Sequence, residues 1–135
     1  MNRRKAREQA FILVFERSIN HSPVSEIIDN AETSDDVRID EFAERLAGGA
    51  ERNEAAIDGT IGKYIRGWTL SRLSKVSLAL LRLALYEMKF EPDIPVSVSI
   101  NEAVTLAGKY GSADDAPFVN GVLGSAAKEM GEKDA

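Results

Sequence analysis

Residues 74–90, SKVSLALLRLALYEMKF, decide the fold of this chain. Val76, Leu80 and Leu83 recur at helical spacing, and Leu81 and Leu85 flank them, so little polar surface is left. We expect this segment to form a helix that is buried at the centre of the protein.

Helical patterns extend from this segment in both directions. Gly67-Trp68-Thr69 and residues 91–95 break the pattern on either side of it. The expected helices run from the cap Asn2 to about residue 19, from Ser22-Pro23 to about 31, over 41–65, briefly over 70–73, then over 74–90, 96–109 and 116–129. A frayed tail is expected from Gly131. The sequence therefore predicts one all-α domain over residues 1–135, with about seven helices in one or two adjoining bundles.

The sequence allows more than one interpretation at two of these helices, 41–65 and 96–109. Four glycines, at positions 48, 49, 59 and 62, lie within 41–65, and each costs a helix up to about 1 kcal/mol relative to alanine. We interpret them as points of close helix–helix approach and keep one helix. Residues 96–100 alternate like a strand, but Ala103 and Ala107 continue the helical spacing, and no second strand is predicted to pair with them.

Composition excludes several classes of chemistry. The 135 residues include no cysteine and one histidine. Disulfides, thiolate catalysis and cysteine-based zinc sites are thereby excluded, and a histidine triad or metal cluster is not expected. The acidic pairs Asp35-Asp36 and Asp114-Asp115 stand where helices begin, where capping explains them. No enzyme signature, cofactor site or metal site is predicted.

The chain also lacks the pattern of an exported or membrane protein. The apolar run at Ala10–Phe15 is only six residues long and is closed by Glu16 and Arg17, so it is not a secretory signal. The run at 78–90 contains three charges and is too short to span a membrane. We expect a cytoplasmic protein.

The net charge of −5 hides an alternation of sign. Residues 1–19 hold five cations and two anions, and residues 59–90 hold six and one. Residues 20–58 hold three cations and eleven anions, and residues 91–135 hold three and eight. A fold with one basic and one acidic face is one interpretation, and ordinary solvated helix surfaces are the other.

Four cations open the first helix. Arg3, Arg4 and Arg7 are three and four residues apart and share a helical face, with Lys5 to one side. Cations at a helix N-terminus oppose the helix dipole, at about 0.3–1 kcal/mol each. Arginine bridges phosphates with its planar guanidinium, so this cluster indicates a polyanionic partner more than a solubilising first turn.

Phe118 and Asn120 open the last helix. Val119, Val122 and Leu123 already supply its inward stripe, which leaves the aromatic ring and the amide to face elsewhere. An exposed aromatic beside an amide is typical of sites that hold single-stranded RNA. A hydrophobic staple on the core explains Phe118 equally well.

At these residues the chain resembles the NusB transcription antitermination factor family over roughly residues 3–128. The matching stretches are Arg4-Lys5-Ala6-Arg7 with Ala10 and Phe15, Leu81–Glu87, Ile94-Pro95, Ile100–Val104 with Leu106-Ala107, Lys109-Tyr110-Gly111 and Phe118–Leu123. The resemblance implies two roughly perpendicular three-helix bundles with an arginine-rich first helix. It also implies binding of boxA RNA together with NusE, the small-subunit ribosomal protein, and assembly with RNA polymerase and other Nus factors. Termination would be suppressed, chiefly in ribosomal RNA operons, and no reaction catalysed.

The resemblance also implies which residues form the RNA site. Its electrostatic part would be Arg3, Arg4, Lys5 and Arg7, and its C-terminal part Lys109, Tyr110, Asp114, Phe118 and Asn120. Asn101 and Glu102 would fix the helix junction between the two parts, and the NusE surface is expected on 74–90 and its neighbours. The basic arm is short, so NusE is expected to complete the RNA surface. Four neutralised phosphates predict a salt slope near −2.8.

Two alternatives stay open. Some RNA cytosine methyltransferases carry a NusB-like domain, but a chain of 135 residues without cysteine is not such an enzyme by itself. The other is a protein-interaction module without RNA contact, in which the acidic region 20–58 docks a basic partner. Some family members also self-associate, and a homodimer would hide the RNA surface.

Overall fold

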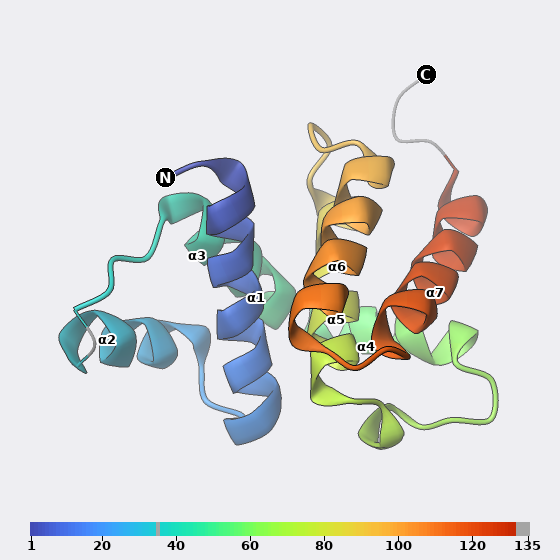
Figure 1. Cartoon of the computed structure of the whole chain (residues 1–135), viewed down its shortest axis with the longest axis horizontal. Coiled ribbons are helices and arrows are strands. Elements are labelled where there is room, and N and C mark those ends of the chain that lie inside the picture. Colours follow the sequence, from blue (N-terminus) through green and yellow to red (C-terminus); the bar gives the residue numbers. More distant parts are fainter. Residues whose placement is uncertain (35, 132–135) are drawn as a thin grey trace.

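The computed structural model describes residues 1–34 and 36–131. These residues form seven α-helices and one short 3-10 helix, joined by loops (Figure 1). In chain order they are α1 (Arg3–Asn20), α2 (Val24–Ser34), α3 (Glu41–Arg52), α4 (Glu54–Tyr64), η1 (Leu70–Arg72), α5 (Lys75–Phe90), α6 (Val96–Tyr110) and α7 (Asp115–Met130). These two ranges contain no strand, so the predicted all-α fold is confirmed. The expectations for Asp35 and for the tail beyond Gly131 concern residues outside them.

The helices form two groups that α5 joins. In Figure 1, α1, α2 and α3 lie on one side of the molecule, and α4, α6 and α7 lie on the other. Helix α5 packs against α1 and α3 of the first group and against α4, α6 and α7 of the second. The prediction of a central helix is therefore confirmed.

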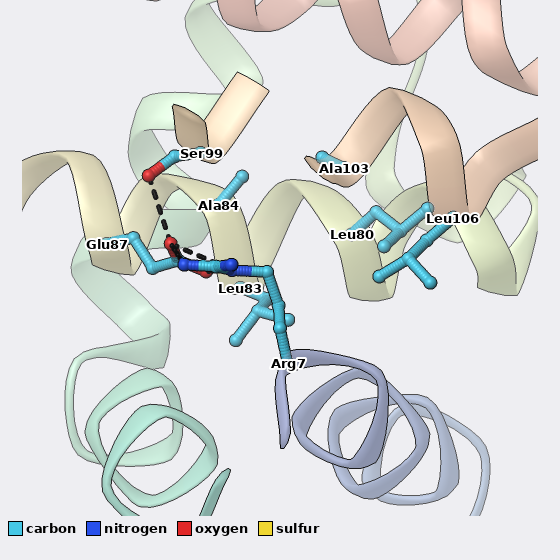
Figure 2. A pocket seen from close by; sticks show the side chains of 8 residues that line it. All are labelled: Arg7, Leu80, Leu83, Ala84, Glu87, Ser99, Ala103 and Leu106. Carbon is cyan, nitrogen blue, oxygen red and sulfur yellow. Dashed lines mark hydrogen bonds and ion pairs between the residues drawn. The ribbon is translucent and has the colours of Figure 1, made fainter. Parts of the chain in front are cut away.

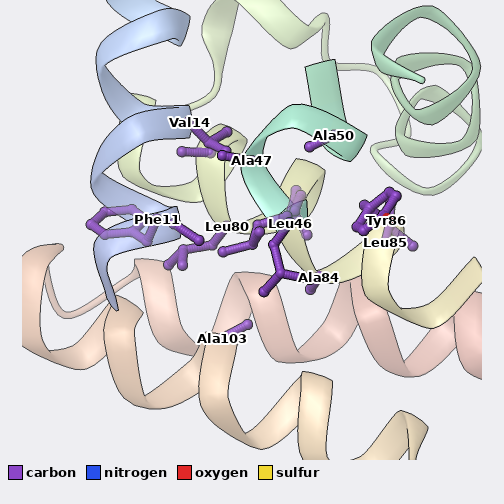
Figure 3. Packing of buried hydrophobic residues seen from close by; sticks show 14 of the residues in the cluster. Phe11, Val14, Leu46, Ala47, Ala50, Leu80, Ala84, Leu85, Tyr86 and Ala103 are labelled. Carbon is purple, nitrogen blue, oxygen red and sulfur yellow. The ribbon is translucent and has the colours of Figure 1, made fainter. Parts of the chain in front are cut away.

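The core follows α5. Leu80, Leu81 and Leu85 are completely buried, and eleven of the sixteen α5 residues are buried. Figure 3 shows Leu80 between Phe11 of α1 and Leu46 of α3, and Leu85 beside Tyr86 of the same helix. Each leucine buried in this way contributes about 1.5–3 kcal/mol relative to an exposed position.

The single helix predicted over 41–65 is wrong. It is divided at Asn53, where the backbone (φ −110°, ψ 15°) leaves helical geometry. The Asn53 backbone N–H and side-chain Nδ2 both donate to the Gly49 carbonyl oxygen, at 3.1 and 2.9 Å. Asparagine competes for backbone groups in this way at helix ends, so it ends α3 and lets α4 begin at Glu54.

Close helix approach explains one of the four glycines. A Cβ atom on Gly49 would lie 2.3 Å from Cζ of Tyr86, so α3 reaches α5 only because this position has no side chain. A Cβ atom on Gly59 or Gly62 would meet nothing within 4 Å. Those two glycines sit on open surface of α4, and no contact in the structure explains them.

Candidate nucleic-acid interface

Arg3, Arg4 and Lys5 lie exposed in the first turn of α1. Asn2 caps this turn, since its side-chain oxygen accepts from the Lys5 N–H at 2.8 Å. No acidic residue occupies the turn to offset the cations. Arg3 lies over the Phe42 ring of α3, 3.9 Å from its centroid, and Arg4 is 77% exposed while pairing with Glu102 at 3.2 Å. The first turn thus presents three cations to solvent.

Arg7 is placed differently, which corrects the expectation that it shares an exposed face with Arg3 and Arg4. Its side chain points between α5 and α6 and is 6% exposed (Figure 2). The guanidinium donates to Glu87 from Nε and Nη2, at 3.0 Å each, and Ser99 donates to the same carboxylate at 3.0 Å. Glu102 pairs with Arg7 at 3.4 Å. A guanidinium held in this way connects α1 to α5 and α6 and is not part of the exposed surface.

Glu102 and Glu8 connect α1 to α6. Glu102 of α6 pairs with Arg4 and Arg7, in agreement with its expected role at the helix junction. The Asn101 side chain, expected to share this role, is exposed, and its backbone carbonyl accepts from Thr105 within α6. The junction is therefore built from carboxylates and arginines.

The last turn of α6 lies against α1 through Glu8. One Glu8 carboxylate oxygen accepts from Lys109 Nζ at 2.5 Å and from the Tyr110 hydroxyl at 2.6 Å. The hydrogen bonds from Lys109 and then Tyr110 hold the pKa of Glu8 below its usual value, and the Glu8 carboxylate raises the pKa of Lys109 and of Tyr110. The Tyr110 ring also packs on Phe11, with centroids 5.0 Å apart. These contacts place Lys109 and Tyr110 beside the basic first helix.

Asp115 anchors the start of α7. Its carboxylate accepts from the hydroxyls of Ser74 and Ser77 at 2.5 and 2.6 Å, and from the Ser112 N–H at 2.8 Å. Burial works against the charged form, but the hydrogen bonds from these three serines outweigh it and leave the Asp115 pKa below its usual value. Asp115 therefore joins α7 to α5, and its neighbour Asp114 is left exposed.

Phe118 and Asn120 do not line the same groove. Residues two apart on a helix do not face each other, and only Phe118 lines the groove beside the start of α7. Phe118 is half-buried and packs against the core, as a hydrophobic staple would, and its contact with RNA stays a prediction. Asn120 is exposed on another side of α7.

That groove has a volume of about 370 Å³ and includes two residues that were not predicted, Trp68 and Arg72. They lie in the connection between α4 and α5. The available signal was a lone tryptophan directly after Gly67, in a segment that breaks the helical pattern. A second groove, of about 360 Å³, lies beside the first turn of α1 and is lined by Arg3, Arg45 and Asp93 among others.

Among residues 1–34 and 36–131, no group of three or more histidine, aspartate or glutamate side chains is arranged to hold a metal ion. None of the helices in these ranges combines the length and the apolar character that crossing a membrane requires.

Known proteins resemble this chain over nearly its whole length. The NusB family model matches residues 4–128. A transcription antitermination protein NusB of Clostridium botulinum is 44% identical over 139 aligned positions, which cover 92% of this chain and 98% of that protein. The structure of T. maritima NusB has a TM-score of 0.84 and 35% identity, and covers 96% of this chain and 92% of the other. A crystal structure of the antitermination factors NusB and NusE in complex with double-stranded RNA has a TM-score of 0.82 and 26% identity, over 96% of this chain and 99% of the matched chain. The chain belongs to the NusB family.

Proposed function

We propose that this protein is a transcription antitermination factor that binds boxA RNA together with NusE and suppresses termination, chiefly in ribosomal RNA operons. A related structure contains NusB, NusE and RNA. We further propose that the complex joins RNA polymerase and other Nus factors, and that the protein acts by binding without catalysing a reaction.

The observation that carries the proposal is that the basic start of α1 and the last turn of α6 lie side by side. The exposed cations Arg3, Arg4 and Lys5 lie at the start of α1, and Glu8 holds Lys109 and Tyr110 of α6 against the same helix. The short connection from α6 to α7 continues to Asp114 and Phe118. A single RNA strand that follows this path meets cations first and an aromatic ring afterwards, which is the combination that binds single strands.

Individual roles follow from exposure. Arg3, Arg4, Lys5 and Lys109 would neutralise phosphates, Tyr110 and Phe118 would pack on bases, and Asp114 and Asn120 would form hydrogen bonds with base edges. Arg7 would not contact the RNA but would hold α1 on α5 and α6 through its buried ion pairs. The NusE surface stays a prediction, and the elements around α5 suit it better than α5 itself, because most of α5 is buried.

The acidic region gives less support to a protein-interaction module. Arg17 pairs with Glu51 and Glu54 at 3.3 and 3.0 Å, and Arg82 pairs with Glu54 and Asp58 at 3.1 and 2.8 Å. Three of the acidic side chains in 20–58 thus have partners within the protein, which leaves fewer for a basic protein.

The test is a titration of fluorescently labelled boxA RNA and of a scrambled RNA, with and without NusE. We expect tighter binding to boxA, further strengthened by NusE, and loss of this binding in Phe118→Asp. The matched control is Phe90→Asp, because Phe90 is an exposed aromatic at the far end of α5. Equal and weak binding to both RNAs in the presence of NusE would contradict the proposal.

A further inference from the structure

Trp68 stands out on the surface because it is large, apolar and 57% exposed. It is fixed at a tight turn, in which the Trp68 N–H donates to the Ile65 carbonyl oxygen at 2.8 Å and Gly67 adopts a positive φ of 75°. The Arg72 guanidinium lies 5.4 Å from the centroid of the indole. The ring is therefore held in place by backbone geometry and by a cation–π contact, although no core covers it.

The indole borders the groove that Phe118 lines at the start of α7. Asp114 lines the same groove, and its side chain makes no capping hydrogen bond to α7. The groove thus combines two aromatic side chains, a guanidinium and an exposed carboxylate. Its continuity with Phe118 connects it directly to the surface proposed above for RNA.

We propose that this groove binds one unstacked base of the RNA strand, a base that carries an exocyclic amino group. The inference rests on the proposed RNA-binding function and extends it to a subsite. The base stacks on Trp68 beside Phe118, and Arg72 neutralises a neighbouring phosphate. A carboxylate only accepts hydrogen bonds, so Asp114 accepts from the exocyclic amino group of adenine, cytosine or guanine. Uracil has no amino group and carries a carbonyl oxygen, itself an acceptor, where cytosine carries its amino group, so it is disfavoured in this orientation.

Trp68 is also the probe, because it is the only tryptophan in the sequence. Single-stranded boxA RNA is titrated into the full chain, in the absence and presence of NusE, while indole fluorescence and the anisotropy of labelled RNA are recorded. We expect the fluorescence to be quenched in step with the anisotropy rise. Trp68→Ala is expected to weaken RNA binding roughly 5- to 150-fold, the range measured for loss of one stacked base, whereas Trp68→Phe keeps most of the affinity.

Asp114→Ala tests the hydrogen bond separately. Each amino-bearing base of the RNA is replaced in turn by uracil. At one position the replacement is expected to weaken binding to the unaltered protein and to have little further effect on the Asp114→Ala variant. Phe90→Ala is the matched control for removal of an exposed ring, and thermal unfolding of each variant checks that it is folded.

The outcomes separate this inference from the proposed function. If boxA binding is specific and depends on Phe118, but Trp68→Ala binds normally and the indole is not quenched, the subsite is overturned and the function stands. If the unaltered protein binds no boxA RNA with or without NusE, both are overturned. If Trp68→Ala weakens binding of NusE and leaves binding of RNA by the protein alone unchanged, the groove is a protein-docking surface and the base subsite is overturned.

Discussion

At the scale of single residues, Arg7 and Glu87 form an ion pair that is almost completely removed from solvent. Their side chains are 6% and 1% exposed, and the Ser99 hydroxyl completes the hydrogen bonding of the carboxylate. Removing one member of a buried pair leaves the other charge without compensation, which costs about 3–5 kcal/mol. The pair therefore determines how α1 sits on α5 and α6, and the proposed RNA surface depends on that arrangement.

We expect Arg7→Met to lower the free energy of unfolding by about 3–5 kcal/mol in urea denaturation. Arg7→Met combined with Glu87→Leu should recover much of this loss, because no unpaired charge stays buried. Arg4→Met is the matched control: Arg4 is 77% exposed in its pair with Glu102, so its loss should cost no more than about 1 kcal/mol. Equal costs for Arg7→Met and Arg4→Met would contradict a structural role for Arg7.

The residue scale is also where sequence reasoning reached its limit. Spacing along one helix placed Arg7 with Arg3 and Arg4, but the direction of a side chain depends on what the neighbouring helices offer it. Glu87 and Ser99 lie 80 and 92 positions further along the chain, and only the folded structure brings them to Arg7. Trp68 was not predicted as a site residue for the same reason, because its groove forms only when α7 lies beside the connection after α4.

At the scale of elements, the approach of α3 to α5 depends on Gly49. A Cβ atom there would lie 2.3 Å from the Tyr86 ring, and the Tyr86 hydroxyl is held by Glu91 at 2.8 Å, so the ring is not free to move away. We expect Gly49→Ala to destabilise the protein by about 1–3 kcal/mol in urea denaturation. Gly59→Ala is the matched control, because a Cβ atom there meets nothing within 4 Å. It should be neutral or stabilise by up to about 1 kcal/mol through helix propensity. Equal effects of the two changes would refute the close approach.

Periodicity was sufficient for elements whose packing follows their own pattern, such as α5 and α7, and for the choice of helix over strand at 96–110. It failed at Asn53, where the apolar spacing continues through the break between α3 and α4. There the end of α3 depends on an asparagine side chain, and Glu51 and Glu54 on either side of it are drawn to Arg17. The break between α3 and α4 is capped locally by Asn53 and is also held by ion pairs with Arg17 of α1. A pattern of apolar residues contains no information about such ion pairs.

At the scale of the whole molecule, binding of RNA has to overcome a net charge of −5. Long-range attraction is therefore weak, and binding depends on the few cations that meet phosphates directly. Ion pairs with Arg17 and Arg82 hold part of the acidic surface within the fold, and Glu102 leaves Arg4 largely exposed. This balance supports the proposal that NusE strengthens the binding of RNA by this protein.

The number of these contacts can be counted from the salt dependence of binding. With Arg7 buried, five exposed cations are assigned to phosphates in the proposed complex: Arg3, Arg4, Lys5, Arg72 and Lys109. About 0.7 per phosphate on a single strand gives a slope of log affinity against log salt of about −3.5. Arg4→Ala should reduce the slope to about −2.8, because it removes one contact. Lys128→Ala, which removes an exposed cation at the far end of α7, should leave the slope unchanged. The measurement is RNA anisotropy between about 50 and 200 mM salt. A slope of about −4.2 that falls by about 0.7 in Arg7→Met would instead place the Arg7 guanidinium on the RNA, and α1 would then have to open away from Glu87 on binding.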